Sequence, residues 1–536
     1  MLFVVLYATK GFSSKAESPN LSILAFNDCY ELHPLADGRG GLARFAGVIK
    51  QTHKEMGKDR VVTLMAGDFL SPSPLNTAKI NTPKYTGTIN GRQMVDAFNT
   101  MGVEYVAFGN HEFDLGNEYL NNNLASSLFK YLAINVESMS PEELDHKWTD
   151  SAIIERGGVK IAIIGLVLDT PAVASVKVNT YSETVQKIKE KLQEWKNEKR
   201  EYDILIGLTH QSVGDDKKLA DDVPEFDIII GGHEHENQFY VRSANRRSIP
   251  VAKADSNIKT YFRHDIYFTL PKDVKERIGT AYNNPGSLRV VSRLMPVDDT
   301  LKPDPETQAV CDWWRSEAMK SFPGIDPTVP MAYFTMPVDA RDSVTRNQQS
   351  SIAQWIAEAM GDDMSRFANK ISEDCPPFPG FDAERLPSFF NTGSIRIDDV
   401  LQGCLSEYDA LRLLPFGNST YTIRLSGQAL KQALESGYHA KGSGEYISWD
   451  PDVITLGNND EFLIGNTPIN VDATYCVNVA GYMIKPSTPT YFTPGTFEVI
   501  QGSDKSINMA VIDYFQKKFP PANGGCSAQH LYVPKY

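Results

Sequence analysis

Polar side chains that can bind metal ions follow five separate apolar runs of this chain. The runs ILAFN, VVTLMAG, YVAFG, DILIGLT and DIIIGG lead to these side chains, which are Asp28, Asp68, Asn110, His210, His233 and His235. Short β-rich runs bounded by glycine are typical of buried parallel strands. The carboxyl ends of such strands form the binding edge of an open α/β sheet. The pattern therefore predicts one polynuclear metal site at that edge.

The types of ligand indicate which ions this site would hold. Carboxylate, amide oxygen and imidazole suit zinc, manganese, iron or cobalt. Asp28 and Tyr30 are two residues apart, as are His233 and His235, so each pair projects to one side of an extended strand. Asp68 is the candidate for a carboxylate that bridges two ions. Two ions about 3.5–4 Å apart can hold a phosphoryl group and generate a hydroxide nucleophile near neutral pH.

Strand and helix patterns divide the chain into two predicted domains. Between 21 and 270 apolar strands alternate with helical stretches at 41–56, 91–101 and 183–199, which predicts a layered α/β domain. The stretch 271–304, rich in Pro, Asn and Gly, indicates a boundary, and 305–322 is the pattern of a connecting helix. Further helices at 350–360 and 507–519, and a strand–turn–helix at 420–437, predict a second domain. We expect a leader at 1–20, a metal-binding domain at 21–300, a linker helix within 301–330 and a substrate domain at 331–536.

Length, charge and hydropathy limit the number of domains and the kinds of binding partner that we expect. The 536 residues exceed the size of one core, so two domains are expected. A net charge of −14 and a pI near 5.3 argue against nucleic acid or an anionic membrane surface as partner. No apolar segment is long enough to span a bilayer. The apolar run at 2–8 is either the core of a secretory signal or part of an ordinary N-terminus, and the first reading predicts a secreted or periplasmic protein.

The chain has six cysteines, without a CxxC motif that would indicate a zinc site. In an exported protein, Cys375–Cys404 and Cys476–Cys526 are conceivable disulfides, although sequence does not choose the pairing. Cys29 is interpreted as a buried apolar residue.

Ordered motifs in both halves carry a family resemblance. FND, AGDF, GNHEFD, LTH and GGHEH resemble the motifs of the calcineurin-like metallophosphoesterases, and specifically of the 5′-nucleotidase family. RNQQSSIAQWI, FFNTGSIR and LRLLPFGN resemble that family's C-terminal motifs. The resemblance implies an N-terminal four-layer α/β/β/α sandwich that carries two metal ions, and a C-terminal α/β domain that binds substrate.

Metal and acid–base roles follow from this resemblance position by position. It implies one ion held by Asp28, Asp68 and His235, and another held by Asp68, Asn110, His210 and His233. His111 and Asp114 resemble the catalytic dyad that stabilises developing charge or protonates the leaving oxygen. Tyr30 stands where the family commonly has His. It either binds as a phenolate, most favourably to ferric iron, or fills the space while water completes the ion's shell.

Substrate roles are implied in the same way. Arg346 and Arg396 resemble the pair that binds the substrate phosphate, and Asn391 could hydrogen-bond a ribose or base edge. Phe416 resembles one wall of the base-binding sandwich. Tyr482 falls where the second aromatic wall is expected, but the family's Gly-Gly-Asp-Gly run is missing there, and Tyr491 or Phe492 could take the role instead.

The leading hypothesis for function is hydrolysis of nucleoside 5′-monophosphates by in-line attack of a metal-bound hydroxide, with zinc as the favoured metal. The resemblance also allows hydrolysis of UDP-sugars, nucleoside di- or triphosphates, or 2′,3′-cyclic nucleotides. Outside the enzymes, the chain could be a nucleotide-binding protein that lost turnover through Tyr30. Oligomeric state and preferred base are not predicted.

Overall fold

A computed structural model describes residues 18–35, 37–139, 148–169, 176–244, 247–268, 288–375, 378, 382, 385–485, 491–524 and 526. The chain forms two compact units, the first ending at Lys320 and the second beginning at Ser321. Within the described residues, no helix has the length and apolar character needed to cross a membrane.

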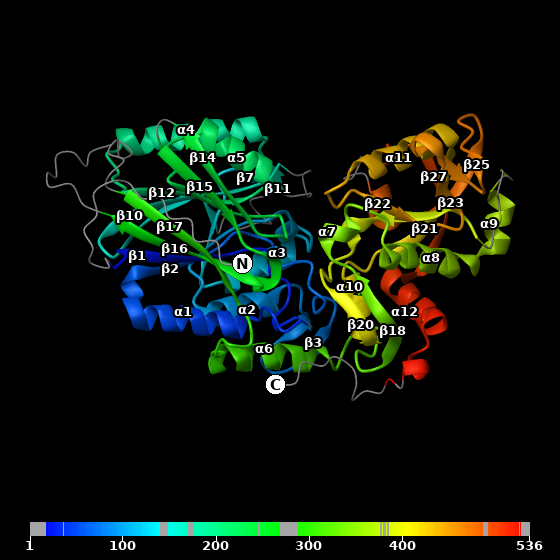
Figure 1. Cartoon of the computed structure of the whole chain (residues 1–536), viewed down its shortest axis with the longest axis horizontal. Helices are drawn as coiled ribbons and strands as arrows, with labels where there is room; N and C mark the ends of the chain where they lie inside the picture. The colour runs from blue at the N-terminus through cyan, green and yellow to red at the C-terminus, as the bar shows by residue number, and fades with distance from the viewer. Residues whose placement is uncertain are drawn as a thin grey trace. The chain divides into compact units, whose positions relative to one another are not determined.

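Two mixed sheets form the centre of the first unit (Figure 1). One has the strand order β17-β16-β1-β2-β5-β6-β8, and these strands are Leu288–Pro296, Thr260–Phe268, Leu21–Phe26, Val61–Met65, Tyr105–Ala107, Lys130–Leu132 and Trp148–Thr149. The other has the order β14-β15-β13-β12-β10-β9, and these strands are Gln238–Ala244, Arg247–Lys253, Ile228–Gly232, Ile204–His210, Val159–Val167 and Ser151–Arg156. The pairs β1–β2, β2–β5 and β12–β13 are parallel, as the apolar runs predict, and β13–β15 is parallel as well.

Helices cover the outer faces of both sheets. Buried apolar side chains of β1, β2, β10, β12, β13 and β16 form a shared core between the sheets. The helices α4 (Tyr181–Asn197) and α5 (Val213–Asp222) bury Ile188, Trp195 and Leu219 against the second sheet. On the first sheet, Phe45 of α1 (Leu42–Met56) and Phe98 of α2 (Arg92–Met101) pack against Phe26. The predicted four-layer α/β/β/α sandwich is therefore confirmed.

The second unit is built on a five-stranded sheet, counted within the described residues, with the order β22-β19-β26-β21-β27. These strands are Ile447–Trp449, Ser388–Asn391, Thr474–Ala480, Ser419–Ser426 and Phe497–Ser506. The main helices around it are α8 (Ser351–Ser365), α10 (Glu407–Leu413), α11 (Gly427–His439) and α12 (Ile507–Lys518). An antiparallel ribbon of β18 (Pro330–Asp339) and β20 (Val400–Ser406) completes the main frame.

Shorter elements connect these layers. Those of the first unit are η1 (Lys58–Arg60), β3 (Lys79–Asn81), β4 (Thr86–Thr88), η2 (Asn110–Phe113), α3 (Asn117–Ser126), β7 (Val136–Ser138), β11 (Val176–Val178) and η3 (Ser256–Ile258). Those of the second unit are α7 (Asp342–Thr345), α9 (Ala368–Asp374), η5 (Thr392–Ser394), β23 (Ile454–Leu456), η6 (Asn458–Asp460), β24 (Phe462–Ile464), β25 (Thr467–Pro468), η7 (Gly481–Ile484) and η8 (Pro521–Gly524).

The region that the sequence assigns to a boundary contains regular structure. β17 lies within 271–304 and pairs antiparallel with β16 of the first sheet. The expected connecting helix forms as α6 (Pro305–Ala318), where the Asp304 carboxylate accepts from the Thr307 backbone N at 2.9 Å and caps the helix. α6 packs on α1 and α2. The domain limits at 300 and 331 stay predictions.

Both conceivable cysteine pairings are wrong. The disulfides are Cys375–Cys476 and Cys404–Cys526, with Cα–Cα distances of 6.0 and 5.7 Å. Cys375 follows α9 and meets β26, while Cys526 follows η8, which packs on the β18–β20 ribbon. These contacts join positions 101 and 122 residues apart, which spacing in sequence does not reveal. Cys29 is a buried free thiol, as interpreted.

Candidate metal centre

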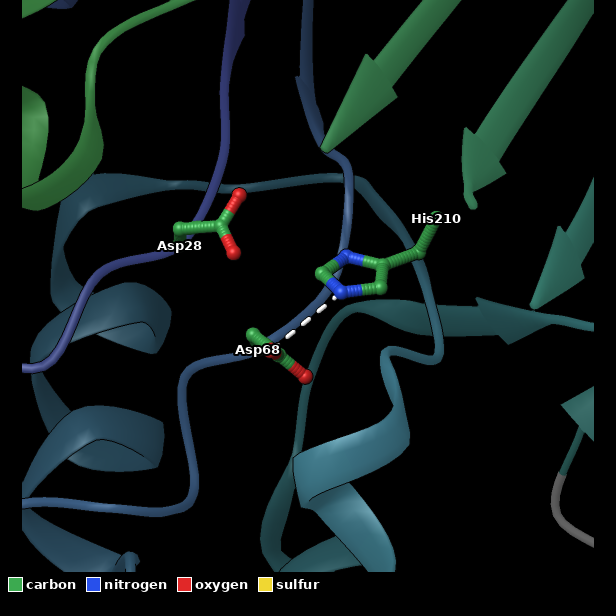
Figure 2. A group of neighbouring side chains, drawn as sticks. All are labelled: Asp28, Asp68 and His210. Atoms are coloured by element: carbon green, nitrogen blue, oxygen red, sulfur yellow. Dashed lines mark ion pairs between the residues drawn. The ribbon is translucent and has the colours of Figure 1, made fainter. Parts of the chain in front are cut away.

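Asp28, Asp68 and His210 converge in the first unit, where each offers one ligand atom and these atoms lie within 4.8 Å of one another (Figure 2). Asp28 and Asp68 follow β1 and β2 of one sheet, whereas His210 ends β12 of the other. All three side chains are buried. The strand ends of two different sheets thus meet at one point.

Asp68 lies between two groups of candidate ligands. Its Oδ2 is 3.2 Å from Nε2 of His210 and accepts from the Tyr30 hydroxyl at 3.2 Å. Its Oδ1 accepts from the His111 backbone N at 2.9 Å. Because one carboxylate faces both groups, it has the position that a bridging ligand requires.

The first group is completed by Asp28, Tyr30 and His235. Nε2 of His235 is 3.6 Å from Oδ1 of Asp28. The Tyr30 hydroxyl is 3.4 Å from the same oxygen and 3.2 Å from Nε2 of His235. Tyr30 therefore directs its oxygen into the ligand group rather than away from it.

The second group contains His210, His233 and Asn110. The rings of His210 and His233 lie edge to face with centroids 5.4 Å apart. Nδ1 of His210 is 2.7 Å from the Ala66 carbonyl oxygen, which leaves Nε2 directed at Asp68. Within the described residues, Oδ1 of Asn110 is buried without a hydrogen-bond partner, whereas Nε2 of His210 contacts the Asp68 carboxylate. Buried polar atoms without a partner are costly, so this donor set fits a cation.

The ionisable groups of the centre shift one another's pKa. Burial raises the pKa of Asp28, although His210 and His235 oppose this. Burial acts on Asp68 too, but His210 and His111 hold the pKa of its carboxyl below the ordinary value. Against the effect of burial, Asp68 and Asp28 raise the pKa of His210 to about 10. Asp68 and His210 thus stabilise opposite charges on each other in this buried place.

The backbone is strained where the ligands stand. Asp28, Asp68 and His233 have positive φ values of 48°, 62° and 88°. Left-handed backbone is uncommon for residues other than glycine and clusters at functional sites. Glycines precede two of these residues where other backbone lies close, since a Cβ on Gly67 would lie 2.6 Å from Gly109 N and a Cβ on Gly232 would lie 2.3 Å from the Ala66 carbonyl oxygen.

His111 and Asp114 form the predicted pair beside this centre. Nδ1 of His111 is 2.8 Å from Oδ2 of Asp114, which also accepts from the Ser71 hydroxyl at 3.1 Å. Both lie at η2 and its end, and their side chains are 17% and 34% exposed, against 0% for His210 and 2% for Asp68. The carboxylate can therefore orient the imidazole.

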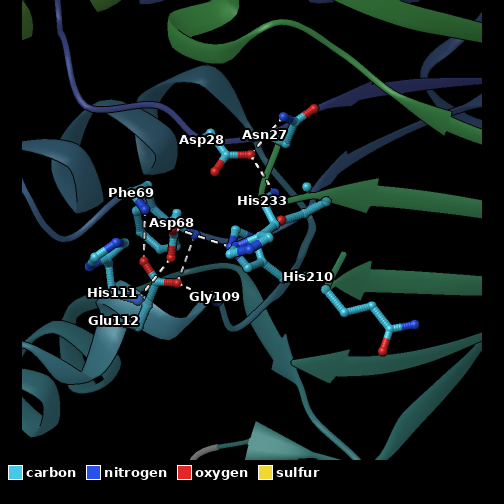
Figure 3. A network of polar contacts seen from close by, with 12 residues as sticks. Asn27, Asp28, Asp68, Phe69, Gly109, His111, Glu112, His210 and His233 are labelled. Atoms are coloured by element: carbon cyan, nitrogen blue, oxygen red, sulfur yellow. Dashed lines mark hydrogen bonds and ion pairs between the residues drawn. The ribbon is translucent and has the colours of Figure 1, made fainter. Parts of the chain in front are cut away.

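Sequence reasoning missed Glu112, which supports the centre from behind (Figure 3). Its buried carboxylate accepts from the backbone N of Asp68, Phe69 and Leu70 at 2.8, 2.7 and 3.1 Å, and also from Gly109 N. Burial and the nearby Asp68 raise the pKa of Glu112 to about 7. The residue stood inside the GNHEFD motif, but only the fold shows which backbone groups it contacts.

Asn27 was missed as well. Its Nδ2 donates to Oδ2 of Asp28 at 2.7 Å, and its Oδ1 accepts from Ala254 N at 2.8 Å. His233 N donates to the same Asp28 oxygen at 2.9 Å. These contacts orient Asp28 through groups that no ligand spacing identifies.

The predicted substrate residues lie in the second unit. The Arg396 guanidinium lies 5.2 Å from the Phe416 ring centroid, and Arg346 forms an ion pair with Asp342 at 2.6 Å. Asn391 accepts from the Ser394 hydroxyl at 3.1 Å through Oδ1. The structure thus brings Arg396 and Phe416 together and holds Arg346 against an acidic neighbour.

The three candidates for the second aromatic wall differ in exposure. Tyr482 in η7 is 37% exposed. Tyr491 and Phe492 are buried, where Tyr491 donates to the Glu445 carbonyl oxygen and Phe492 packs on Phe497. Tyr482 is therefore the most exposed of the three candidates.

Comparisons with known proteins agree with this architecture. The family model for calcineurin-like phosphoesterases matches residues 21–237, and the model for the 5′-nucleotidase C-terminal domain matches 331–488. A 5′-nucleotidase of Mus musculus is 24% identical over 438 residues, which cover 76% of this chain and 68% of that protein. Together the two models match more than half of the chain in the order expected.

Solved structures share the fold at lower identity. A 5′-nucleotidase precursor from Thermus thermophilus has a TM-score of 0.73 at 18% identity, covering 93% of this chain and 96% of its own. The sulfate thiohydrolase SoxB of the same species has a TM-score of 0.65 at 14% identity, covering 96% of both chains. The fold alone therefore does not define the substrate.

The chain belongs to the 5′-nucleotidase family of the calcineurin-like metallophosphoesterases. It is a phosphoric monoester hydrolase, and the class to which it belongs uses a dimetal centre.

Proposed function

We propose that the protein hydrolyses nucleoside 5′-monophosphates to nucleoside and inorganic phosphate at a centre that binds two divalent ions, with zinc favoured. The observation that carries this proposal is the position of the buried Asp68 carboxylate, whose Oδ2 lies 3.2 Å both from the Tyr30 hydroxyl of the first group and from Nε2 of His210 in the second group. Asp28, Asp68 and His235 would hold one ion. Asp68, Asn110, His210 and His233 would hold the other.

Two bound ions would supply positive charge to the phosphoryl oxygens and activate a water nucleophile. The role of Tyr30 in the first group stays open between a ligand and a residue that fills space beside the ion. Its hydroxyl is within 3.4 Å of Asp28, Asp68 and His235, which supports a role as a ligand or a hydrogen-bond donor to the ligands.

His111 is proposed as the general acid. Asp114 contacts Nδ1 of its ring, so the other ring nitrogen, Nε2, would donate to the leaving oxygen or stabilise the developing charge. The greater exposure of this pair compared with Asp68 and His210 supports contact with a substrate that enters from solvent.

Residues of the second unit are proposed to select a nucleotide. Arg346 and Arg396 would bind phosphate or neighbouring oxygens, since a planar guanidinium forms paired hydrogen bonds. Asn391 would contact the ribose or base, and Phe416 and Tyr482 would stack on the base. Stacking accepts any base, so we propose a broad preference among nucleosides.

The second candidate is hydrolysis of a larger or cyclic nucleotide. The segment after Tyr482 lacks the family's Gly-Gly-Asp-Gly run, which favours a changed pocket. UDP-sugars, nucleoside di- and triphosphates and 2′,3′-cyclic nucleotides are therefore tested beside the monophosphates.

Export from the cytoplasm is proposed as well. Two disulfides in the second unit support an oxidising compartment, because such bridges are rare in reducing ones.

Phosphate release from this panel, measured with the chelated protein and after adding back zinc, manganese or cobalt, tests the proposal. We expect chelation to abolish release from AMP and zinc to restore it. Release from AMP that persists in the metal-free protein would contradict the dimetal assignment. Turnover of another class with AMP untouched would replace the monophosphate proposal by the second candidate.

A further inference from the structure

Lys253 is a fully buried lysine at the end of β15, in the second sheet of the first unit. A charged ammonium is seldom placed in such a position unless acceptors surround it. Burial lowers the pKa of Lys253, but Asp216 and Glu234 together raise it by more, so its charge is retained. Lys253 is neither a proposed metal ligand nor a proposed catalytic residue.

The ammonium contacts both loops that carry metal ligands of the second sheet. Nζ donates to the Gly232 carbonyl oxygen at 2.8 Å, directly before His233. It also donates to the Gln211 carbonyl oxygen, directly after His210. The Lys253 side chain therefore connects the loop that follows His210 to the loop that carries His233 and His235.

Two carboxylates complete the surroundings of the ammonium. Oδ2 of Asp216, in α5, is 2.9 Å from Nζ, and Oε2 of Glu234 is also an ion-pair partner. Oε1 of Glu234 accepts from Val213 N at 2.6 Å, and Gln211 Nε2 donates to Oδ1 of Asp216 at 3.0 Å. The carboxylates thus tie the start of α5 to the same two loops.

Glu234 contacts this group although it stands between two proposed ligands. His235 contacts Asp28 in the metal centre, whereas Glu234 contacts Lys253. The packing leaves no space at the neighbouring glycine, since a Cβ on Gly231 would lie 2.9 Å from Cε of Lys253 and 2.7 Å from Oδ2 of Asp216. The group is a built part of the fold rather than a surface ion pair.

We propose that Lys253, Asp216 and Glu234 form a charge clamp that holds His210, His233 and His235 in metal-binding geometry, with Lys253 as a positioning residue. This inference rests on the proposed dimetal function. The charge clamp contacts the backbone of the ligand loops and not the ligand rings, so we expect it to affect the affinity for metal ions rather than to contact the phosphoryl group.

The test compares metal binding by the full-length wild-type protein, Lys253→Met and Glu234→Gln. Each protein is stripped with a chelator and titrated with Zn²⁺ against a chromophoric competitor, and Co²⁺ absorption spectra report ligand geometry. Glu234→Gln keeps the shape and an acceptor for Val213 N while it removes the charge. Mutation of residues that support metal ligands weakens metal affinity about 10–100-fold, and we expect a loss of this size for at least one ion in both variants.

A matched control separates positioning from general stability. Arg293→Met removes the ion pair between Arg293 on β17 and the buried Asp265 on β16. Both residues belong to the first sheet, whereas His210, His233 and His235 follow strands of the second sheet. This substitution should lower stability while both zinc affinities and the Co²⁺ spectrum stay as in the wild type. Restored turnover of Glu234→Gln at saturating zinc would further support a positioning role.

If Lys253→Met does not fold, Glu234→Gln alone decides. Folded variants with wild-type zinc affinities and Co²⁺ spectra would overturn the charge clamp while the proposed function stands. A wild-type protein that binds no ion would overturn the proposed function, which is a different result from the same titration.

Discussion

At the scale of single residues, the proposed metal binding and the proposed proton transfer involve different groups. Asp28, Asp68 and His210 are buried together, whereas His111 contributes its backbone N to Asp68 and its ring to Asp114. A substitution of the His111 ring therefore leaves the contact with Asp68 in place. The two functions can be removed one at a time.

The prediction is that His111→Asn lowers kcat for phosphate release by about 10²–10⁴-fold, the range typical of a lost general acid. The bound zinc content should stay at the wild-type level, measured by elemental analysis of the same samples. Asp68→Asn is the contrasting variant and should lose bound metal. Full activity of His111→Asn would show that the dyad assignment is wrong.

Residue spacing predicted which side chains meet, but not what supports them. Asp28, Asp68 and His210 could be assigned because each stands at the end of an apolar run. Asp28 and Asp68 share the edge of one sheet, whereas His210 comes from the second sheet, which the runs do not reveal. Lys253 and Glu112 could not, since their contacts depend on the register of β15 beside β13 and on the path of the loop after β2. A single charged residue in a strand sequence does not indicate which residue will be its ion-pair partner.

At the scale of elements, Glu112 connects the turn after β5, where it stands, to the loop after β2. Its carboxylate accepts several backbone N–H groups that would otherwise be buried without acceptors. We predict that Glu112→Gln lowers the free energy of unfolding of the first unit by about 2–4 kcal/mol, because an amide turns a donor toward those groups. Urea unfolding measures this, with the exposed Glu155→Gln on β9 as a control that should change it little.

The first sheet should also lose stability in acid through His264 on β16. Burial lowers its pKa to about 3, while Nδ1 lies 2.8 Å from the Ser292 hydroxyl. The unfolded chain binds a proton below about pH 6.5 that the folded chain does not, so stability is full above that pH and falls as pH drops toward 3. At pH 5 this amounts to about 2 kcal/mol.

The variant His264→Asn tests this, because it removes the titrating group and keeps a polar atom near Ser292. We expect its stability to fall less than that of the wild type between pH 7 and pH 5, measured by urea unfolding at each pH. Equal pH dependence in both proteins would show that His264 is not the source. The sequence period predicted several of the strands and helices, but it did not predict the burial or the hydrogen-bond partner of a single polar residue such as His264.

At the scale of the whole molecule, the two units differ in how they are stabilised. Alternating strands and helices predicted a layered α/β domain, since period and apolar runs are local signals, and the family resemblance implied the four-layer sandwich. The cysteine pairs were not predicted, because Cys375 meets Cys476 and Cys404 meets Cys526 only through the folded second unit. The described cysteines of the first unit, Cys29 and Cys311, are free and buried.

Reduction should therefore affect one unit and spare the other. Each disulfide closes a loop of about a hundred residues, and loss of such a bridge costs about 2–4 kcal/mol. We expect reducing agent to lower the free energy of unfolding of the second unit by this amount per bridge, and so to lower its melting temperature. The melting temperature of the first unit should respond to chelator instead. Calorimetry with each agent alone separates the two, with Cys375→Ala/Cys476→Ala as the variant that reproduces part of the reductive shift. A shift of both transitions by reductant would mean that the units unfold together, and an unchanged second transition would mean that the bridges add no stability.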